Sequence, residues 1–275
     1  MSLRINSNLS SISAQRFLTK NQRQVDDSFK ALSSGSRLST PQNDAAGFAI
    51  SELIRAQVAG AGQSVKNTQL AQAFIQTAEG GLNEQNNILV RMRELAVNSA
   101  SDTIGDQERE FINEEFKLLI AEFDRIAKST RFGSKQLLAG ESEDYSFQVG
   151  AYKGEENRIE FTLDTDTRSD AVGIDGLDIS DQDDALDSLE DIDEAVTEIA
   201  SARSKLGAVQ SRLIFAEDNL AVQKQNLEEA RSIIADVDVA EETSKLARAS
   251  VLQEAGLAVL AQANSYPKKL VQLIG

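Results

Sequence analysis

The amino-acid sequence predicts a mainly α-helical protein: a long antiparallel coiled-coil rod with paired terminal helices and a small β-hairpin at the middle of the chain. Composition is the first reason, because 41% of the 275 residues are hydrophobic while only 5% are aromatic and only two are proline. A heptad pattern between Asp183 and Val237 is the second. The third is one short segment in which apolar residues recur at every second position. Aliphatic seams between helices are therefore expected to form the core.

The segment from Asp183 to Val237 is expected to form one very long helix. A large aliphatic residue recurs at every seventh position, and a mostly small residue follows three positions later. The large residues are Ile192, Ile199, Leu206, Leu213, Leu220, Leu227 and Ile234. At 1.5 Å per residue this helix would be roughly 80 Å long, with a seam that needs partner helices. An intramolecular bundle and a rod built for assembly both satisfy that need.

Two terminal segments are expected to supply one pair of helices. From Leu3 to Leu32 the apolar residues form a short stripe and then a shifted one, and Gly35 and Pro41 end the helix. The first stripe is Ile5, Leu9 and Ile12, and the second is Leu18, Val25, Phe29 and Leu32. The segment from Ala240 to Gly275 has a similar face, made of Leu252, Ala255, Gly256, Val259, Leu260 and Ala263.

Two further helices are predicted in the first half of the chain. One runs from about Asp44 to Ser99, with Leu82, Ile88, Leu89, Met92, Leu95 and Ala96 on one face. Four glycines within it each cost roughly 1 kcal/mol relative to alanine, and we expect them to mark close helix contacts. They are Gly60, Gly62, Gly80 and Gly81. The next helix carries the stripe Ile112, Phe116, Leu119, Phe123 and Ile126 and ends before Gly133.

The middle of the chain contains the expected strand pair and an acidic loop. Tyr145, Phe147 and Val149 alternate with polar residues, and so do Ile159, Phe161 and Leu163, which is typical of a β-hairpin with one buried face. From 164 to 194 there are thirteen acidic residues and a single base. No aspartate there has the glycine and glutamate spacing of a calcium-binding loop, so a solvated acidic surface is expected.

This layout predicts two domains. Residues 1–40 and 240–275 would form a discontinuous terminal coiled-coil domain. Residues 41–239 would form a helical rod domain, with the hairpin and acidic loop at about 140–182. If the central helices pair, the two terminal helices leave the rod at the same end and can pair with each other.

Composition excludes several classes of function. The chain has no histidine and no cysteine, so it lacks an imidazole base, a thiol nucleophile, disulfides and a typical zinc site. We therefore predict no enzyme activity, no cofactor and no catalytic, cofactor-binding or metal-binding residue. The net charge of −16 argues against nucleic acid and anionic membranes as partners. No stretch is apolar enough for membrane insertion, and Met1–Lys20 lacks the apolar core of a cleaved signal peptide.

Several sequence blocks resemble those of bacterial flagellins. In the first half these are LSSGSR at 32–37, DAAGFAIS at 44–51, TAEG at 77–80 and RMRELAV at 91–97. In the second half they are GAVQSRL at 207–213, LQEAG at 252–256 and LAQAN at 260–264. The resemblance covers about residues 3–140 and 185–274. Departures from the usual family pattern occur at Ser39, Asn43, Gln225 and Ile233.

The resemblance implies a short flagellin with a reduced middle region: a secreted, structural subunit that forms a helical homopolymer in the flagellar filament. It also implies an export chaperone that binds the C-terminal helix, cap or junction proteins, and ends that order on assembly. A flagellin-sensing Toll-like receptor would contact Arg91, Leu95 and Glu115, for which an ordinary helix seam and ion pair is the alternative. The residues expected to mediate subunit assembly are Ile5, Leu9, Leu18, Phe29, Leu252, Val259, Leu260 and Leu270. Intramolecular packing between the terminal helices is the alternative for that set.

The same helical layout is compatible with two other functions. A hook–filament junction protein would share the terminal helices but would join instead of polymerising. A soluble coiled-coil adaptor would bind partners through the rod and form an oligomer of fixed size.

Overall fold

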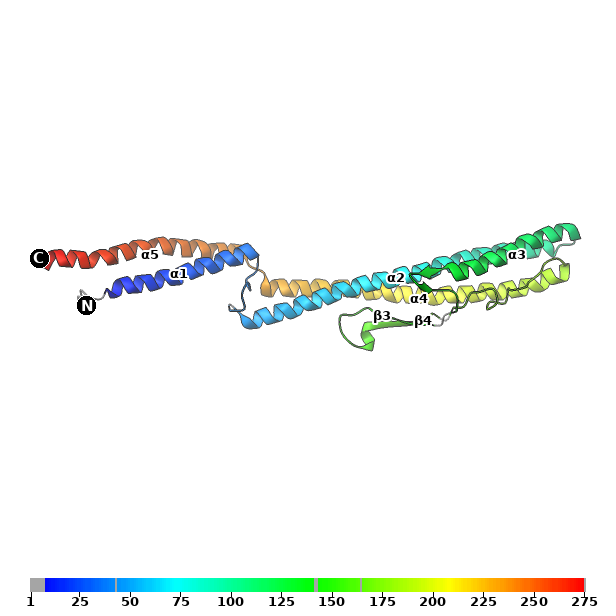
Figure 1. Cartoon of the computed structure of the whole chain (residues 1–275), viewed down its shortest axis with the longest axis horizontal. Coiled ribbons are helices and arrows are strands. Elements are labelled where there is room, and N and C mark those ends of the chain that lie inside the picture. Colours follow the sequence, from blue (N-terminus) through cyan, green and yellow to red (C-terminus); the bar gives the residue numbers. More distant parts are fainter. Residues whose placement is uncertain (1–7, 43, 141–142, 164, 275) are drawn as a thin grey trace. The chain divides into compact units, whose positions relative to one another are not determined.

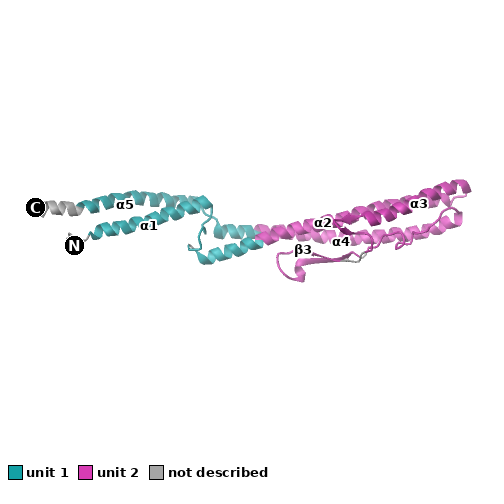
Figure 2. Cartoon of the chain, in the orientation of Figure 1, with its two compact units in different colours: residues 1–57, 226–275 teal, residues 58–225 magenta. Residues whose placement is uncertain are grey.

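The structure, a computed structural model, describes residues 8–42, 44–140, 143–163 and 165–274, with the backbone alone described at 143 and 266–274. The chain divides into two compact units, residues 1–57 with 226–275 and residues 58–225 (Figure 2). This division falls inside two helices. The domain boundaries that we expected from sequence, near residues 40 and 240, differ from this division. They correspond to the breaks between helices, around 35–44 and 236–238.

The predicted fold class is confirmed. The described residues form five long helices: α1 (Leu9–Ser34), α2 (Ala45–Ser99), α3 (Asp106–Ser129), α4 (Gln182–Ala235) and α5 (Val239–Ile274). Helix α1 begins where the side chain of Asn8 accepts from the backbone N–H of Ser11, and ends at Gly35, whose φ of 68° suits glycine. The side chain of Asp44 accepts from Gly47 at the start of α2.

In the unit of residues 1–57 and 226–275, α1 and α5 lie side by side and run antiparallel (Figure 1). The connection from α1 to α2 and the connection from α4 to α5 are joined by two backbone hydrogen bonds. The backbone N–H of Arg37 donates to Ala235 O at 2.7 Å, and that of Val237 donates to Gly35 O at 3.0 Å. These bonds satisfy backbone groups where the helices break.

In the unit of residues 58–225, α2, α3 and α4 share one hydrophobic core. The predicted seam of α4 is buried from Ile192 to Leu220, which confirms the heptad interpretation. Helices α2 and α4 run antiparallel, since Arg93 pairs with Asp193 while Gln72 donates to Glu217. The predicted faces of α2 and α3 are also inward: Leu82, Leu89, Met92, Phe116 and Phe123 are fully buried.

Two of the four glycines in α2 mark close contacts, as expected. A Cβ at Gly60 would lie 3.2 Å from that of Ala151, and one at Gly81 would meet Thr130 and Leu138 at 2.7 Å. Gly62 and Gly80 have open space around the Cβ position, so the contact interpretation is wrong for these two.

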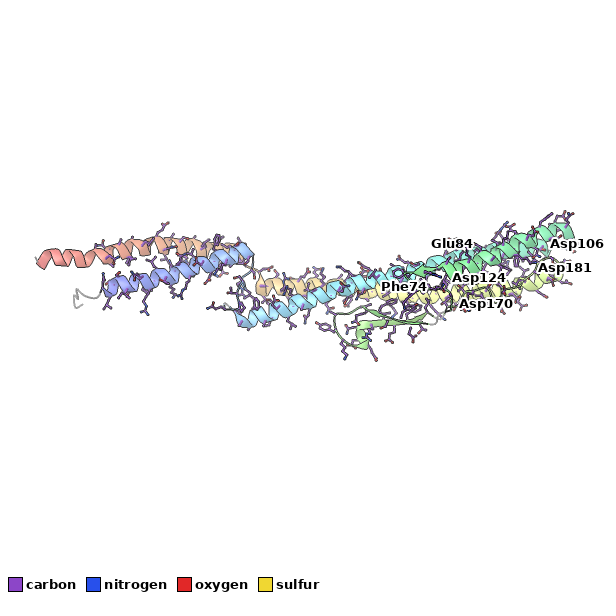
Figure 3. The ribbon with its side chains drawn as sticks, viewed as in Figure 1. Phe74, Glu84, Asp106, Asp124, Asp170 and Asp181 are labelled. Atoms are coloured by element: carbon purple, nitrogen blue, oxygen red, sulfur yellow. The ribbon has the colours of Figure 1, made fainter. Side chains whose placement is uncertain are left out.

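The predicted hairpin consists of β3 (Glu143–Gln148) and β4 (Arg158–Leu163), joined through the short helix η1 (Glu155–Asn157). Tyr145 pairs with Phe161 and Phe147 with Ile159, as the alternating pattern requires. A second, smaller hairpin of β1 (Arg131–Phe132) and β2 (Lys135–Gln136) was not predicted, because strands of two residues have no measurable period. Phe74 of α2 lies against the main hairpin (Figure 3), with its ring centroid 4.8 Å from that of Tyr145.

The acidic segment before α4 is more than a solvated surface, which corrects our expectation. Ile174 and Ile179 are fully buried, and the carboxylate of Asp178 accepts from Asn113 and Lys117, both at 2.8 Å. The ammonium of Lys117, followed by the side chain and then the backbone N–H of Ser180, lowers the pKa of Asp178 to about 2. These contacts fasten the loop to α3.

Candidate assembly surfaces

The α1–α5 pair has a narrow seam of small residues. On α1 the buried residues are Ser11, Ala14, Ser28 and Ala31, and on α5 they include Ala249 and Ala263. Small side chains let two helix backbones approach closely, so interlocking depends on shape more than on the area of large apolar groups.

Polar contacts along the seam set the register of the two helices. Asn8 and Asn21 each donate from Nδ2, to Ala263 O and Ala249 O, at 2.8 Å. Both contacts cross between helices to a backbone carbonyl. The pairing is therefore specific in register, because a shift would leave the amides without these partners.

A half-buried carboxylate lies at the other end of the seam. The hydroxyl of Ser28 donates to Oε1 of Glu242 at 2.6 Å, and Lys245 lies 3.2 Å from Oε2. The hydrogen bond from Ser28, supported by Lys245, lowers the pKa of the Glu242 carboxyl below its ordinary value. Glu242 is thus held in its charged form within the pair.

The candidate assembly residues divide into two groups. Leu9 and Phe29 are both 65% exposed, and Leu252 and Val259 are 54% and 59% exposed, so packing within the pair does not bury them. Leu18 and Leu260 are half-buried on the seam instead. Ile5 lies outside the described residues, and so does the side chain of Leu270.

Only part of the predicted face of α5 is covered by α1. Gly256, Leu260 and Ala263 face α1, whereas Leu252 and Val259 lie on an exposed flank. The second α1 stripe likewise joins the half-buried Leu18, Val25 and Leu32 to the exposed Phe29, while the small residues at the centre of the seam give no hydrophobic signal. Sequence reasoning also missed other exposed apolar side chains of the pair, namely Phe17, Val251 and Leu257; Ile12, named only as part of a stripe, is exposed too.

Together these exposed side chains make an unusual surface. Large hydrophobic residues lie on more than one flank of both α1 and α5, so no single partner helix could cover them. Apolar surface of this extent marks sites of association with other protein surfaces.

Charge is distributed unevenly between the two units. The unit of residues 1–57 and 226–275 has 12 basic and 11 acidic residues, and the unit of residues 58–225 has 16 basic and 33 acidic ones. All of the net negative charge therefore belongs to the second unit. Many copies of the nearly neutral unit can pack together with little charge repulsion.

The candidate receptor residues come from two packed helices. Arg91 Nη2 lies 2.8 Å from Glu115 Oε1, and Arg91 also pairs with Glu94 at 3.1 Å. Arg91 and Glu115 are about half exposed, whereas Leu95 is only 5% exposed and packs in the core. The structure thus brings the two charged residues together at the surface, with Leu95 beneath them.

No cluster of metal-ligating side chains occurs in the described part of the chain. No three acidic side chains gather there in an arrangement that could hold a metal ion. Among the same residues, no helix combines the length and apolarity needed to span a membrane.

Comparison with known proteins identifies related chains. Residues 5–143 match the family model of the bacterial flagellin N-terminal helical region, and residues 189–274 match that of the C-terminal helical region. The chain is 39% identical to a flagellin of Halalkalibacterium halodurans, over 98% of this chain and 99% of that one. It is 35% identical to a flagellar filament 30.7 kDa core protein of Treponema maltophilum, again over 98% and 99%.

A solved structure shows the same similarity in three dimensions. The crystal structure of Bacillus cereus flagellin superposes with a TM-score of 0.51 at 25% sequence identity. The match covers 60% of this chain and 94% of that one.

Proposed function

This chain belongs to the bacterial flagellin family, and we propose that its terminal helices α1 and α5 drive its assembly. The protein is a structural subunit that polymerises helically into the flagellar filament used for swimming. We propose that burial of apolar side chains between neighbouring subunits supplies the driving force, since it is the main favourable term in protein association.

The observation that carries this proposal is the exposed apolar surface of the α1–α5 pair. Leu9, Phe29, Leu252 and Val259 are each more than half exposed within the single chain. A monomer gains nothing from such exposure, whereas a polymer buries these side chains against the next copies. We propose that Leu18 and Leu260 act indirectly, by holding the pair together. Ile5 and Leu270 complete the proposed set.

The distribution of charge supports the same arrangement. We propose that residues 1–40 and 240–275 form the inner assembly domain, with the helical region of residues 41–239 facing outward. Residues 1–40 and 240–275 contain ten basic and five acidic residues, so all of the net negative charge lies in residues 41–239, where an acidic outer layer would keep the polymer soluble.

A junction protein and a fixed-size adaptor remain less favoured. The two relatives described above are a flagellin and a flagellar filament core protein. The exposed apolar residues lie on several flanks of the helices, which suits many neighbours better than one partner.

Other partners are proposed from the same surfaces. The exposed flank of α5 that carries Leu252 and Val259 would bind an export chaperone as an amphipathic helix in a groove. Filament cap and junction proteins would meet the same pair at the ends of the polymer. Binding of the chaperone should fall when Leu252 is replaced by serine, as measured by calorimetry.

We also propose that a flagellin-sensing Toll-like receptor binds at the Arg91–Glu115 pair. Both side chains are accessible, while buried Leu95 would support the surface from beneath. The substitution Arg91→Glu should abolish receptor signalling. Undiminished signalling by a correctly folded Arg91→Glu protein would reject this proposal.

The protein works outside the cell, in the filament. We propose that it is exported without cleavage of a signal peptide, because Met1–Lys20 has no continuous apolar core. Mass spectrometry of filament protein should then find the N-terminal sequence intact.

Seeded polymerisation followed by electron microscopy tests the main proposal. The full chain should give open-ended filaments, and a truncated chain of residues 41–239 should give none. Discrete oligomers that persist after truncation would instead support the junction or adaptor function.

A further inference from the structure

A groove lies where the hairpin β3–β4 meets α2. It has a volume of about 350 Å³ and is lined mainly by Leu70, Phe74, Phe132 and Phe147. The Phe74 ring lies 5.6 Å from that of Phe132 and 5.8 Å from that of Phe147, and Leu70 at the rim is 60% exposed. Because a cavity of about 150 Å³ already holds benzene, this groove has room for one aromatic side chain.

An exposed aromatic side chain lies on α4 of the same unit. Phe215 is 72% exposed, and Val222, seven residues later on the same face, is 59% exposed. Leu213 is fully buried two positions before Phe215, a separation of about 200° around a helix. Phe215 and Val222 therefore form a ridge on the side of α4 that faces away from the core.

The groove and the ridge lie at the same level of the α2–α4 pair but on different sides. Gln72 of α2 donates to Glu217 of α4 at 2.8 Å, which places Leu70 and Phe215 near one level. The groove lies on the flank of α2 where Asn67 and Phe74 face the hairpin, about 200° around the helix from Gln72. Phe215 thus cannot reach the groove of its own chain.

The charges beside the two features are complementary. Asp218 is exposed on the ridge between Phe215 and Val222. Arg158 of β4 is exposed beside the groove, where its Nε donates to Oε1 of the groove-lining Gln148 at 3.2 Å. One helical turn is about 5.4 Å, so a ridge seated in the groove brings Asp218 within reach of an arginine side chain at its rim.

We propose that the groove of one subunit receives Phe215 of a second copy of this chain, with Asp218 facing Arg158. The contact joins two different surfaces, so each subunit still offers a free groove and a free ridge. Such a heterologous contact propagates, as a helical polymer requires. The inference rests on the proposed polymerisation and adds a lateral contact in the unit of residues 58–225.

Cysteine cross-linking tests the contact directly, because the chain has no cysteine of its own. Leu70→Cys and Phe215→Cys chains are mixed, polymerised on seeds and oxidised. A cross-linked dimer is expected from this mixture but not from Leu118→Cys mixed with Phe215→Cys, since Leu118 is as exposed as Phe215 but lies on α3. Equal cross-linking in both mixtures, or none with Leu70→Cys, would overturn the proposal.

Charge exchange provides a second test that leaves the apolar surfaces intact. Asp218→Arg or Arg158→Asp alone should raise the critical concentration for polymerisation about tenfold, and the double variant should restore it. Critical concentrations that neither substitution changes would overturn the contact. Wild-type filaments would still form in that case, so polymerisation itself is judged separately.

Discussion

Gly256 of α5 lies directly against Leu18 of α1. A Cβ at position 256 would lie 3.3 Å from Cγ of Leu18, which is tighter than most Cβ contacts, and 3.5 Å from Cδ2, an ordinary contact distance. Glycine costs roughly 1 kcal/mol relative to alanine inside a helix. The close approach of the two helices explains why a glycine occupies this position.

Replacing Gly256 should therefore have an effect that depends on size. In Gly256→Ala the gain in helix propensity roughly offsets the tight contact, so we expect little change in stability. In Gly256→Val the added methyl groups overpack the seam and should cost about 1 to 3 kcal/mol. Thermal unfolding of the full chain, monitored by circular dichroism, measures the relative stabilities of the three proteins. Equal melting of the Val variant and wild type would contradict it.

The hydrogen bond between Ser28 and Glu242 should make the α1–α5 pairing depend on pH. The folded pKa of Glu242 is lowered, so its bond stabilises the pair above the unfolded pKa of about 4.3. That stabilisation is lost as pH falls through the folded pKa. Ser28→Ala should accordingly melt below wild type at pH 7, and the difference should shrink towards pH 3.

Ser13→Ala is the matched control for this prediction. Ser13 belongs to the same helix but is exposed, so its loss should change little at either pH. A difference between Ser28→Ala and wild type that stays constant from pH 7 to pH 3 would show that the carboxylate does not contribute.

Arg109 should be the most sensitive charged residue at the α2–α3 turn. Its buried guanidinium donates from Nε to Ser99 O at 2.8 Å and from Nη2 to Ser101 O at 3.0 Å. Arg109→Ala removes both bonds to its guanidinium, although Ser101 O still accepts from the backbone N–H of Ile104, and should cost about 2 to 3 kcal/mol in the free energy of unfolding. Arg109→Lys should recover little of it, because lysine lacks the planar fork. Urea unfolding measures both.

Arg125 offers a control of the same residue type in the same helix. Its ion pair with Glu122 is exposed, so Arg125→Ala should cost less than about 1 kcal/mol. If the two alanine variants unfold at the same urea concentration, the turn does not depend on Arg109.

Substitutions at Phe29 and Leu18 should distinguish assembly between subunits from pairing of α1 with α5 within one subunit. Phe29→Ser removes an exposed side chain, so the monomer should keep its stability within about 0.5 kcal/mol while the critical concentration rises about tenfold or more. Leu18→Ser should weaken the α1–α5 pair itself, because Leu18 packs on Gly256. Sedimentation of polymer and melting of monomer distinguish the two. Unaltered polymerisation of Phe29→Ser would remove Phe29 from the assembly surface.

Sequence reasoning succeeded where structure follows from local periodicity. The α4 seam from Ile192 to Leu220 and the register of Tyr145 opposite Phe161 both follow from repeating apolar positions within one segment. For the same reason the number and order of long helices could be predicted without knowledge of their partners.

Placement of the candidate site was less predictable. The hydrophobic pattern assigned Leu252 and Leu260 to one face, although only Leu260 turns towards α1. Arg91 and Glu115 were matched through family resemblance, and only packing of α2 on α3 brings their side chains within 2.8 Å.

By itself, then, the sequence determined the helices, the hairpin, the lack of thiol and imidazole chemistry and the flagellin family. Tertiary structure alone decided which flank of each terminal helix is covered and how the acidic loop is fastened by Asp178. The physical reason lies in Ser11, Ser28 and Gly256: close helix packing selects small side chains, whereas a sequence pattern reveals large ones.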